Sequence, residues 1–352
     1  MRAARFHGFG GSVHVEEIDD PRPAPDDVVV RVAACQIGGD IVKIMAGNGP
    51  VRDADRFAFP HTPGYRGAGT IEAVGANVDR FAPGDRVVIN GFLNCGECGP
   101  CRAGHDNLCE RSHMLGVDSG RPGAMAELVK APARAVFALS EDVSFARSTL
   151  LPNIALLVHA YRRADVSGPF TTAIFGCGLV GTGAIATAKA LGATQIIGVD
   201  TVAPALELAR ACGATAVVDA GREDPVQAVL AATDGRGVDV AVEIVGLGET
   251  IASAIRSTRP LGVTLLIGAL GETTIAFPDH DYYRDVIQRE IELRACFGKG
   301  QADFARAVEL AGSGALDLSA LRVRTHPFDD IAQAIDQAGD PADTDVHVVT
   351  FA

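Results

Sequence analysis

The chain has 352 residues, of which 47% are hydrophobic and 21% charged, so we expect two globular domains rather than a disordered chain. A formal net charge of −13 repels nucleic acids and anionic membranes, and neither is an expected partner. The N-terminus lacks an apolar stretch of signal-peptide length, and Pro169 and several glycines interrupt the longest uncharged stretch, Val166 to Ala188, so we expect a soluble cytoplasmic protein.

The first part of the chain is predicted to be mostly β-structure. Short runs of β-branched and other apolar residues at Asp27–Val32, Gly69–Val74 and Asp85–Ile89 are separated by Gly, Pro and Asp turn signals. We assign residues 1–152 to this domain.

Four of the eight cysteines fall within the longest loop-like region, Asn90–Gly123. Their spacing is Cys95-x2-Cys98-x2-Cys101-x7-Cys109, which supplies four thiolates and closes a tetrahedral zinc shell without an open position for substrate. We therefore predict a structural zinc that organises a lobe at about residues 90–123. An iron–sulfur cluster is the chemical alternative, although the spacing differs from the bacterial ferredoxin run. Disulfides would require an oxidising compartment.

After about residue 150, short apolar runs alternate with alanine-rich helical stretches. TTAIFG precedes LVGTGAIATAKALGA, TQIIGVD precedes APALELARACGA, and VDVAVEIVG precedes ETIASAIRSTR. This alternation is typical of successive βαβ units, which form a right-handed, doubly wound parallel sheet. The forty glycines, the absence of Trp and the low aromatic content agree with such a core. We assign residues 153–296 to a Rossmann domain, and the fold class is α/β.

The first βα turn of this domain carries a dinucleotide fingerprint. Gly176, Gly178 and Gly181 fit the G-x-G-x-x-G pattern directly after the strand TTAIF and before a helix. In that context the glycines allow a tight turn, close approach of backbone N–H groups to a pyrophosphate, and close packing of helix on strand. The predicted cofactor-binding residues are Gly176, Gly178, Leu179, Val180, Gly181 and Asp200.

Asp200 ends the next strand, IIGVD, nineteen residues beyond Gly181. A carboxylate at this position accepts hydrogen bonds from the adenine ribose hydroxyls and repels a 2′-phosphate, which predicts NAD, with NADP as the alternative. An ordinary turn or helix-capping role for Asp200 is the other interpretation.

The closing segment, residues 297–352, contains an amphipathic helix at Ala302–Ala311 and ends in the strand-like HVVTF. We expect this segment to return to the first domain.

Together, the β-rich N-terminal domain, the four-cysteine lobe and the Rossmann domain with its Asp resemble the zinc-containing medium-chain alcohol dehydrogenases. Supporting segments are VVVRVAACQIGGDIVKIMAG, PGYRGAGTIEAVGANVDRFAPGDRV, CGECGPCRAGHDNLC and TRPLGVTLLIGALG. The resemblance implies a GroES-like N-terminal domain, a C-terminal segment that rejoins it, and a nicotinamide bound in the cleft between the domains. It also implies a small-molecule substrate and a homodimer or homotetramer.

The ligands of this family's catalytic zinc are missing from the matching positions. Gly38 stands where the family has Cys, Tyr65 and Arg66 stand where it has the His and Glu of G-H-E, and the third ligand falls near Asn153. Glycine has no donor, Arg is always cationic, and Tyr and Asn are poor zinc ligands. Cys35 is the one nearby thiol that could rescue a metal site.

The residues around those ligands change together. In the family, a hydroxyl-bearing residue and a His relay protons from the substrate, and the matching positions here are Asp40 and Lys43. The family also has a carboxylate that orients the zinc-bound His, and Ile41 stands at that position. A carboxylate that orients a ligand has no task once the ligand is gone. A one-residue slip in register would restore Asp40 to the family's Asp position, but it would supply no Cys ligand.

Without a Lewis acid, carbonyl reduction needs another group to stabilise the developing alkoxide. We predict Tyr65 as a proton donor whose pKa neighbouring Arg66 and Lys43 lower, with Asp40 and Lys43 as further candidate catalytic residues. Alternatively, the substrate is an enone or iminium that needs less assistance. The structural alternatives are that Tyr65 fills the space of a lost zinc site and that Asp40 and Lys43 form a surface i,i+3 pair.

The remaining residues that could carry chemistry have structural explanations. His159 lies on an apolar stretch and is interpreted as a core or cleft-lining residue. Cys177, Cys212 and Cys296 are interpreted as small buried residues.

Three hypotheses follow. The first is an NAD(H)-dependent oxidoreductase with a structural zinc only, which acts on a carbonyl or alcohol, an activated C=C or a C=N bond. The second is a conventional zinc-dependent alcohol dehydrogenase with unusual ligands. The third is a catalytically silent NAD-binding sensor or assembly protein. Metal content separates the first two, and turnover of NADH separates both from the third.

Overall fold

The computed structural model describes residues 1–48, 58–166, 168–268, 274–277, 282–340 and 343–351. The chain forms two compact units. Unit 1 comprises Met1–Pro152, Lys299–Gly312 and Arg322–Ala352, and unit 2 comprises Asn153–Gly298 and Ser313–Leu321. The predicted closing segment, 297–352, therefore does not return to the first domain as a whole, because residues 313–321 and the first two residues of the segment cluster with unit 2.

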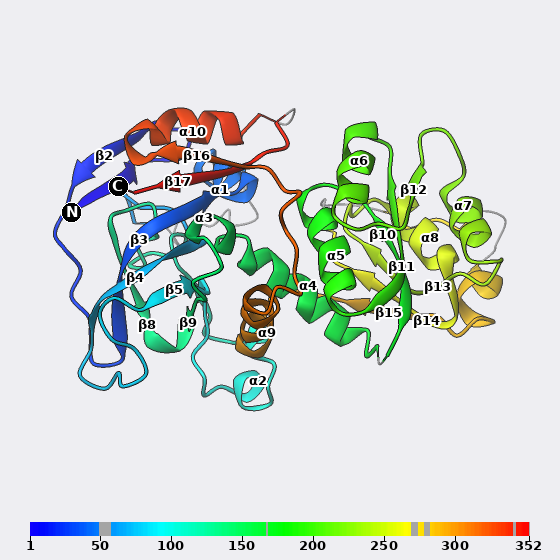
Figure 1. Ribbon diagram of the computed structural model, residues 1–352, viewed down its shortest axis with the longest axis horizontal. Coiled ribbons are helices and arrows are strands. Elements are labelled where there is room, and N and C mark those ends of the chain that lie inside the picture. The colour runs from blue at the N-terminus through cyan, green and yellow to red at the C-terminus, as the bar shows by residue number, and fades with distance from the viewer. Residues whose placement is uncertain (49–57, 167, 269–273, 278–281, 341–342, 352) are drawn as a thin grey trace. The chain divides into compact units, whose positions relative to one another are not determined.

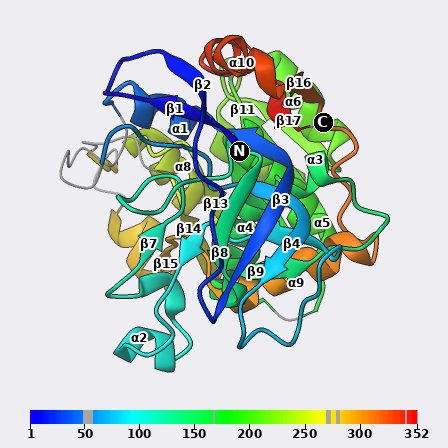
Figure 2. The same cartoon turned by 90° about the vertical axis from the view of Figure 1, so that its left-hand side faces the viewer.

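Unit 1 is built around a seven-stranded sheet with the order β16-β17-β3-β4-β5-β9, in which β8 also pairs with β3. Figure 2 shows the long β3 with β4 and β8 beside it. The C-terminal strand β17 pairs antiparallel with β3, so the end of the chain completes the sheet of the first domain. The strands are β3 (Asp27–Ile37), β4 (Gly67–Val74), β5 (Arg86–Ile89), β8 (Leu128–Pro132), β9 (Val136–Ala138), β16 (Val323–Pro327) and β17 (Val346–Thr350).

Alternation along β3 supplies one face of the core of unit 1. Val28, Val30 and Val32 are buried in a single apolar cluster, which also contains Ile331 and Ile335 of the C-terminal helix α10. This is the period-two pattern of a strand that faces a core. The helices of unit 1 are α1 (Gly39–Met45), α2 (Gly99–Arg102), α3 (Phe145–Ser148), α9 (Gln301–Gly312) and α10 (Ile331–Ala338).

Smaller elements complete unit 1. Strands β1 (Arg2–Phe6) and β2 (Val13–Glu17) form an antiparallel pair. The cysteine lobe, expected as one long loop, contains the paired strands β6 (Phe92–Leu93) and β7 (His113–Met114) and the short helices α2 and η2 (Asp106–Leu108). Figures 1 and 2 both show α2 at the outer end of this lobe. Two further short 3₁₀ helices are η3 (Ala133–Ala135) and η6 (Phe328–Asp330).

Unit 2 contains the predicted doubly wound sheet. Its six strands have the order β12-β11-β10-β13-β14-β15, and each neighbouring pair is parallel. Every residue of β10 is buried, as expected of a strand covered on both faces. The strands are β10 (Phe170–Phe175), β11 (Ala193–Asp200), β12 (Ala216–Asp219), β13 (Val238–Glu243), β14 (Thr258–Leu266) and β15 (Glu292–Ala295).

Helices cover both faces of this sheet. Figure 1 shows α5 and α6 on one face and α7 and α8 on the other. The helices of unit 2 are α4 (Leu151–Arg163), α5 (Leu179–Ala190), α6 (Ala203–Ala211), α7 (Pro225–Ala232), α8 (Gly248–Ser257) and the short π-helix η5 (Tyr283–Ile287). The predicted combination of a β-rich domain and a Rossmann domain is confirmed.

Among the described residues, every helix is too short or too polar to cross a lipid bilayer.

Candidate functional site

The glycine fingerprint forms the turn between β10 and α5. Gly176 has a φ of +98°, a conformation that favours glycine. Gly178 is the N-cap of α5, and a Cβ built there would meet no atom within 4 Å, so its surroundings are open. A Cβ at Gly181 would overlap the carbonyl oxygen of Gly176. These three positions fit a pyrophosphate at the N-terminus of the helix.

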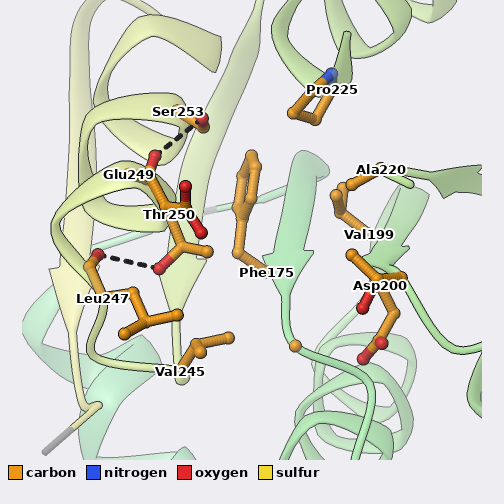
Figure 3. Close-up of a pocket in the computed structure, with 12 residues that line it drawn as sticks. Phe175, Val199, Asp200, Ala220, Pro225, Val245, Leu247, Glu249, Thr250 and Ser253 are labelled. Atoms are coloured by element: carbon orange, nitrogen blue, oxygen red, sulfur yellow. Dashed lines mark hydrogen bonds between the residues drawn. The ribbon is translucent and has the colours of Figure 1, made fainter. Parts of the chain in front are cut away.

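A cavity of about 460 Å³ lies at the carboxyl ends of the strands of unit 2. Figure 3 shows Phe175 between Asp200 on one side and, on the other, Leu247 and Thr250 at the start of α8 (Gly248–Ser257). Open parallel sheets bind ligands at this edge, where the strand order reverses between β10 and its two neighbours. The lining residues are Phe175, Gly176, Val199, Asp200, Thr201, Ala220, Pro225, Val245, Leu247, Glu249, Thr250 and Ser253.

Asp200 connects this cavity to the glycine turn. Its Oδ2 accepts a hydrogen bond of 2.6 Å from the backbone N–H of Cys177, and its Oδ1 accepts one of 2.9 Å from Val202. The carboxylate is therefore held at the rim of the cavity, where it still has acceptor capacity for a ribose hydroxyl. The predicted pair of glycine turn and acidic residue is brought together within unit 2.

Glu243 is a site residue that the sequence reasoning missed. It ends β13, is fully buried, and its Oε1 accepts hydrogen bonds from the N–H groups of Val245 and Gly246 and from the Thr250 hydroxyl. These bonds fix the turn that forms the far side of the cavity. A carboxylate at the end of an apolar strand was the available sequence signal.

The four cysteines of the lobe converge on one point. Their Sγ atoms all lie within 4.8 Å of one another, and two of the Sγ–Sγ distances, Cys95 to Cys101 and Cys98 to Cys109, are 3.9 Å. A tetrahedral zinc with Zn–S bonds of about 2.3 Å requires sulfurs roughly 3.8 Å apart. The donor set therefore fits zinc.

Backbone groups around the cluster favour the thiolate form. The pKa of Cys95 is lowered to about 6, first by the N–H of Glu97 and then by the N–H of Cys98. The Arg111 guanidinium lies 3.6 Å from the same sulfur. When bound, a zinc ion would hold the turns of the lobe together.

The position of the family's catalytic-zinc ligand is filled by a cation. A Cβ built at Gly38 would overlap Nη1 of Arg66 and Oδ1 of Asp40. The Arg66 side chain is 10% exposed and donates to both carboxylate oxygens of Asp40, at 2.9 and 3.1 Å. A guanidinium has no lone pair for a metal and repels a divalent cation. The residues present therefore do not fit a catalytic zinc.

Tyr65 completes this cluster, but not as predicted. It is buried beneath the Arg66 guanidinium, whose Cζ lies 4.3 Å from the ring centroid, and its hydroxyl donates to Asp40. Burial raises the pKa of the phenol, Asp40 raises it further, and Arg66 opposes them incompletely. The predicted lowering of the Tyr65 pKa is wrong, because burial outweighs the nearby positive charge.

Asp40 is held as a carboxylate. Burial would raise its pKa, but the charge of Arg66 and the hydrogen bonds from Arg66 and Tyr65 outweigh that effect and lower it. The described ion pairs include none between Asp40 and Lys43, so the alternative of a surface i,i+3 pair is wrong. The Lys43 side chain is exposed on α1.

The structure also shows the surroundings of the other residues considered for a metal or for catalysis. Cys35 is fully buried, and burial raises the pKa of its thiol to about 12. Asn153 lies in the first turn of α4, and the buried His159 has its Nδ1 3.2 Å from Nη2 of Arg162. The remaining cysteines outside the lobe are buried, as predicted: Cys177, Cys212 and Cys296.

Lys299 joins the cluster and was missed entirely. It is 6% exposed, and its Nζ lies 4.1 Å from the ring centroid of Phe92 and 6.0 Å from that of Tyr65. Burial and the charge of Arg66 lower the pKa of the amine, Asp40 partly opposes them, and the pKa that results is about 7. A usable sequence signal was the scarcity of lysine, since the chain has four lysines and 27 arginines.

Comparison with known proteins identifies the class. Residues 24–141 match the alcohol dehydrogenase GroES-like domain, and residues 180–313 match the zinc-binding dehydrogenase family. L-threonine 3-dehydrogenase of Bacillus subtilis is 30% identical over 91% of this chain and 89% of its own length. Sorbitol dehydrogenase of the same organism is 29% identical over 96% of this chain and 93% of its own length.

A solved structure agrees with this. A putative zinc-binding dehydrogenase from Sinorhizobium meliloti, bound to NADP, superposes with a TM-score of 0.87 at 27% identity, covering 99% of this chain and 98% of its own. The chain belongs to the zinc-type alcohol dehydrogenases of the medium-chain dehydrogenase/reductase superfamily. It is an NAD(P)-dependent dehydrogenase or reductase.

Proposed function

We propose that the protein is an NAD(H)-dependent oxidoreductase with a structural zinc only, which transfers hydride to or from a small molecule without a catalytic zinc. The bond that gains or loses the hydride is the C=O bond of a carbonyl/alcohol pair, an activated C=C bond or a C=N bond. The observation that carries the proposal is the Arg66 guanidinium in the space beside Gly38, where the family has a thiolate ligand.

The cavity in unit 2 supports NAD as the cofactor. Its lining includes the carboxylates of Asp200 and Glu249, and the described part of the chain contributes no Lys or Arg to it. A 2′-phosphate would meet negative charge there without a cation to pair with it. When bound, the nicotinamide supplies or accepts the hydride.

Arg66, Asp40 and Tyr65 supply a fixed polar surface. The two-point ion pair prevents Arg66 from changing direction, so its positive charge is preorganised for an oxygen that becomes negative during hydride transfer. Asp40 positions Arg66, and Tyr65 supports both through its ring and its hydroxyl. Lys43 has no part in this surface, because its side chain is exposed and the described residues show no hydrogen bond or ion pair between it and these groups.

The rival with unusual zinc ligands requires a second metal beside Tyr65. Metal analysis of the purified protein tests it: we expect about one zinc per chain, bound by the lobe cysteines, and about two would overturn the proposal. A Cys109→Ser variant should lose the ion, which shows where it was bound.

Turnover is tested separately with NADH or NADPH and a panel of aldehydes, ketones, enones and cyclic imines. We expect oxidation of NADH with at least one class of acceptor and weaker binding of NADPH. Tight NADH binding without turnover of any acceptor would instead support a silent NAD-binding protein.

A further inference from the structure

Lys299 stands out because the chain uses lysine so rarely. Of the four lysines, Lys43, Lys130 and Lys189 are exposed, whereas Lys299 is buried. Arginine supplies 27 of the 31 basic side chains and would provide a permanent charge. A guanidinium, however, cannot lose its proton within the working pH range, whereas a buried ammonium can.

The amine is held by aromatic faces rather than by a carboxylate. Its described partners are the rings of Phe92 and Tyr65, and no hydrogen bond or ion pair of Lys299 is found among the described residues. The charges that act on it are those of Arg66 and Asp40, which already form a pair. The N–H bonds of this ammonium therefore remain available for a bound molecule.

Two carboxylates fix the backbone that directly follows Lys299. The N–H of Gly300 donates to Oδ2 of Asp303 at 2.9 Å, and the N–H of Gln301 donates to Oδ2 of Asp106 at 2.9 Å. Asp106 belongs to the cysteine lobe and also accepts from Asn94 at 2.5 Å. These two acidic residues are engaged by backbone and amide groups, so the segment that carries Lys299 is tied to the lobe.

We propose that the Lys299 amine is the proton donor and acceptor of the hydride-transfer reaction, an inference that rests on the proposed function. In the reducing direction, the carbonyl carbon accepts hydride from the reduced nicotinamide while the carbonyl oxygen takes a proton from Nζ. The carbonyl is reduced to an alcohol, NADH is oxidised to NAD⁺, and the ammonium becomes a neutral amine that water reprotonates. The reverse direction begins with the neutral amine.

No other group of the cluster fits this role equally well. The pKa of the Tyr65 phenol is raised by burial, and its proton is already donated to Asp40. Arg66 keeps its proton. Burial and Arg66 bring the pKa of Lys299 to about 7, and general acid–base catalysis is most effective when the pKa lies near the working pH.

The protonation state is measured without turnover. In protein labelled with ¹³C at the lysine Cε, we expect one of four resonances to titrate with a midpoint near 7 and to disappear in Lys299→Arg. A Lys299 resonance that titrates at the ordinary value of about 10.4 would overturn the inference.

The catalytic role is measured with the fastest carbonyl acceptor of the panel. We expect kcat/KM for reduction to fall as pH rises through about 7, and Lys299→Arg and Lys299→Met to lose about 10²–10⁴-fold and to lack that pH limb. Lys130→Arg, at an exposed position, is the matched control. NADH affinity and thermal unfolding of each variant show whether it folds.

The outcomes distinguish a failure of the role proposed for Lys299 from a failure of the proposed function. If the wild-type protein reduces the acceptor and Lys299→Arg keeps both the rate and the pH limb, the role of Lys299 is refuted while the proposed function stands. If the wild-type protein reduces no acceptor, the proposed function fails and the role fails with it, whatever the midpoint of the amine.

Discussion

The Arg66–Asp40 ion pair allows a quantitative test of how the cluster around Arg66 is held together. Asp40→Asn removes the negative charge but keeps an oxygen that can accept from Tyr65, so the principal loss is the ion pair. Breaking a fully buried pair from one side costs about 3–5 kcal/mol because the other charge stays buried and unpaired. The Arg66 side chain is 10% exposed and that of Asp40 is 36% exposed. Solvent screening at the carboxylate reduces the expected loss of unfolding free energy to about 2 kcal/mol at pH 7.

A second substitution distinguishes an unpaired buried charge from a general packing defect. Arg66→Met in the Asp40→Asn background removes the remaining charge while it keeps an apolar side chain of similar length. We therefore expect the double variant to be more stable than Asp40→Asn alone, since replacing both partners of a buried pair is often neutral. A double variant destabilised by the sum of the two single changes would refute the reasoning, because independent sites add.

The pH dependence gives a second signature. Because the pKa of Asp40 is lowered in the folded protein, the carboxylate contributes stability above its unfolded pKa of about 3.9 and loses it as pH falls through the folded value. The difference in unfolding free energy between wild type and Asp40→Asn should therefore be complete at neutral pH and shrink below about pH 4. A difference that stays constant down to pH 2 would contradict the ion-pair account.

The assay is urea unfolding followed at Tyr65, the one tyrosine of unit 1. Selective ¹³C labelling of the four tyrosines separates its signal from those of unit 2, so unfolding of unit 1 is measured directly. Asp79→Asn is the control, since Asp79 is exposed and its removal should change the free energy by less than about 0.5 kcal/mol.

Three further changes test other parts of the molecule. Gly181→Ala should weaken NADH binding at least about tenfold, because its Cβ would overlap a carbonyl oxygen of the glycine turn and the loop would have to move; unchanged affinity by calorimetry would contradict this. Asp200→Ala should lower the ratio of NADPH to NADH dissociation constants by about tenfold or more, since it removes a repulsive charge and a ribose acceptor. Cys109→Ser should abolish zinc binding, measured by metal analysis, and shift the NMR midpoint of Lys299 upward as the lobe loosens.

Much of the fold could be predicted because the period of apolar residues and the spacing of turn residues are local properties of the chain. The alternation after residue 150 predicts β10, β11 and β13 and the helices α5, α6 and α8 that follow them, and the strand patterns of the first domain predict β3, β4 and β5. Strand β12 and helix α7 were not predicted. The lobe was different, because its short strands and helices are too brief to show a period. The division of the closing segment between the two units also has no local signal, since residues 313–321 join unit 2 through tertiary contacts alone.

The candidate site was only partly predictable for a related reason. Cys95 and its partners carry their spacing in the sequence, and Gly176 to Asp200 carry a motif. The cluster around Arg66 instead depends on contacts between residues far apart in the chain. Residue types indicated that Tyr65 and Arg66 had replaced metal ligands, but not that burial would raise the pKa of the phenol or that Asp40 would engage both of them. Lys299, more than 200 residues from Tyr65, has no motif.

The lobe and the cluster are linked through short contacts, so a zinc bound by the lobe cysteines would act beyond its own loop. Phe92, against which the Lys299 amine packs, lies three residues before Cys95, and Asp106, which binds the backbone next to Lys299, lies between Cys101 and Cys109. A zinc that fixes the cysteines therefore also fixes the ring and the acceptor that hold the amine. Under the proposed function, a zinc bound by the lobe would position the lysine and would not act on the substrate directly.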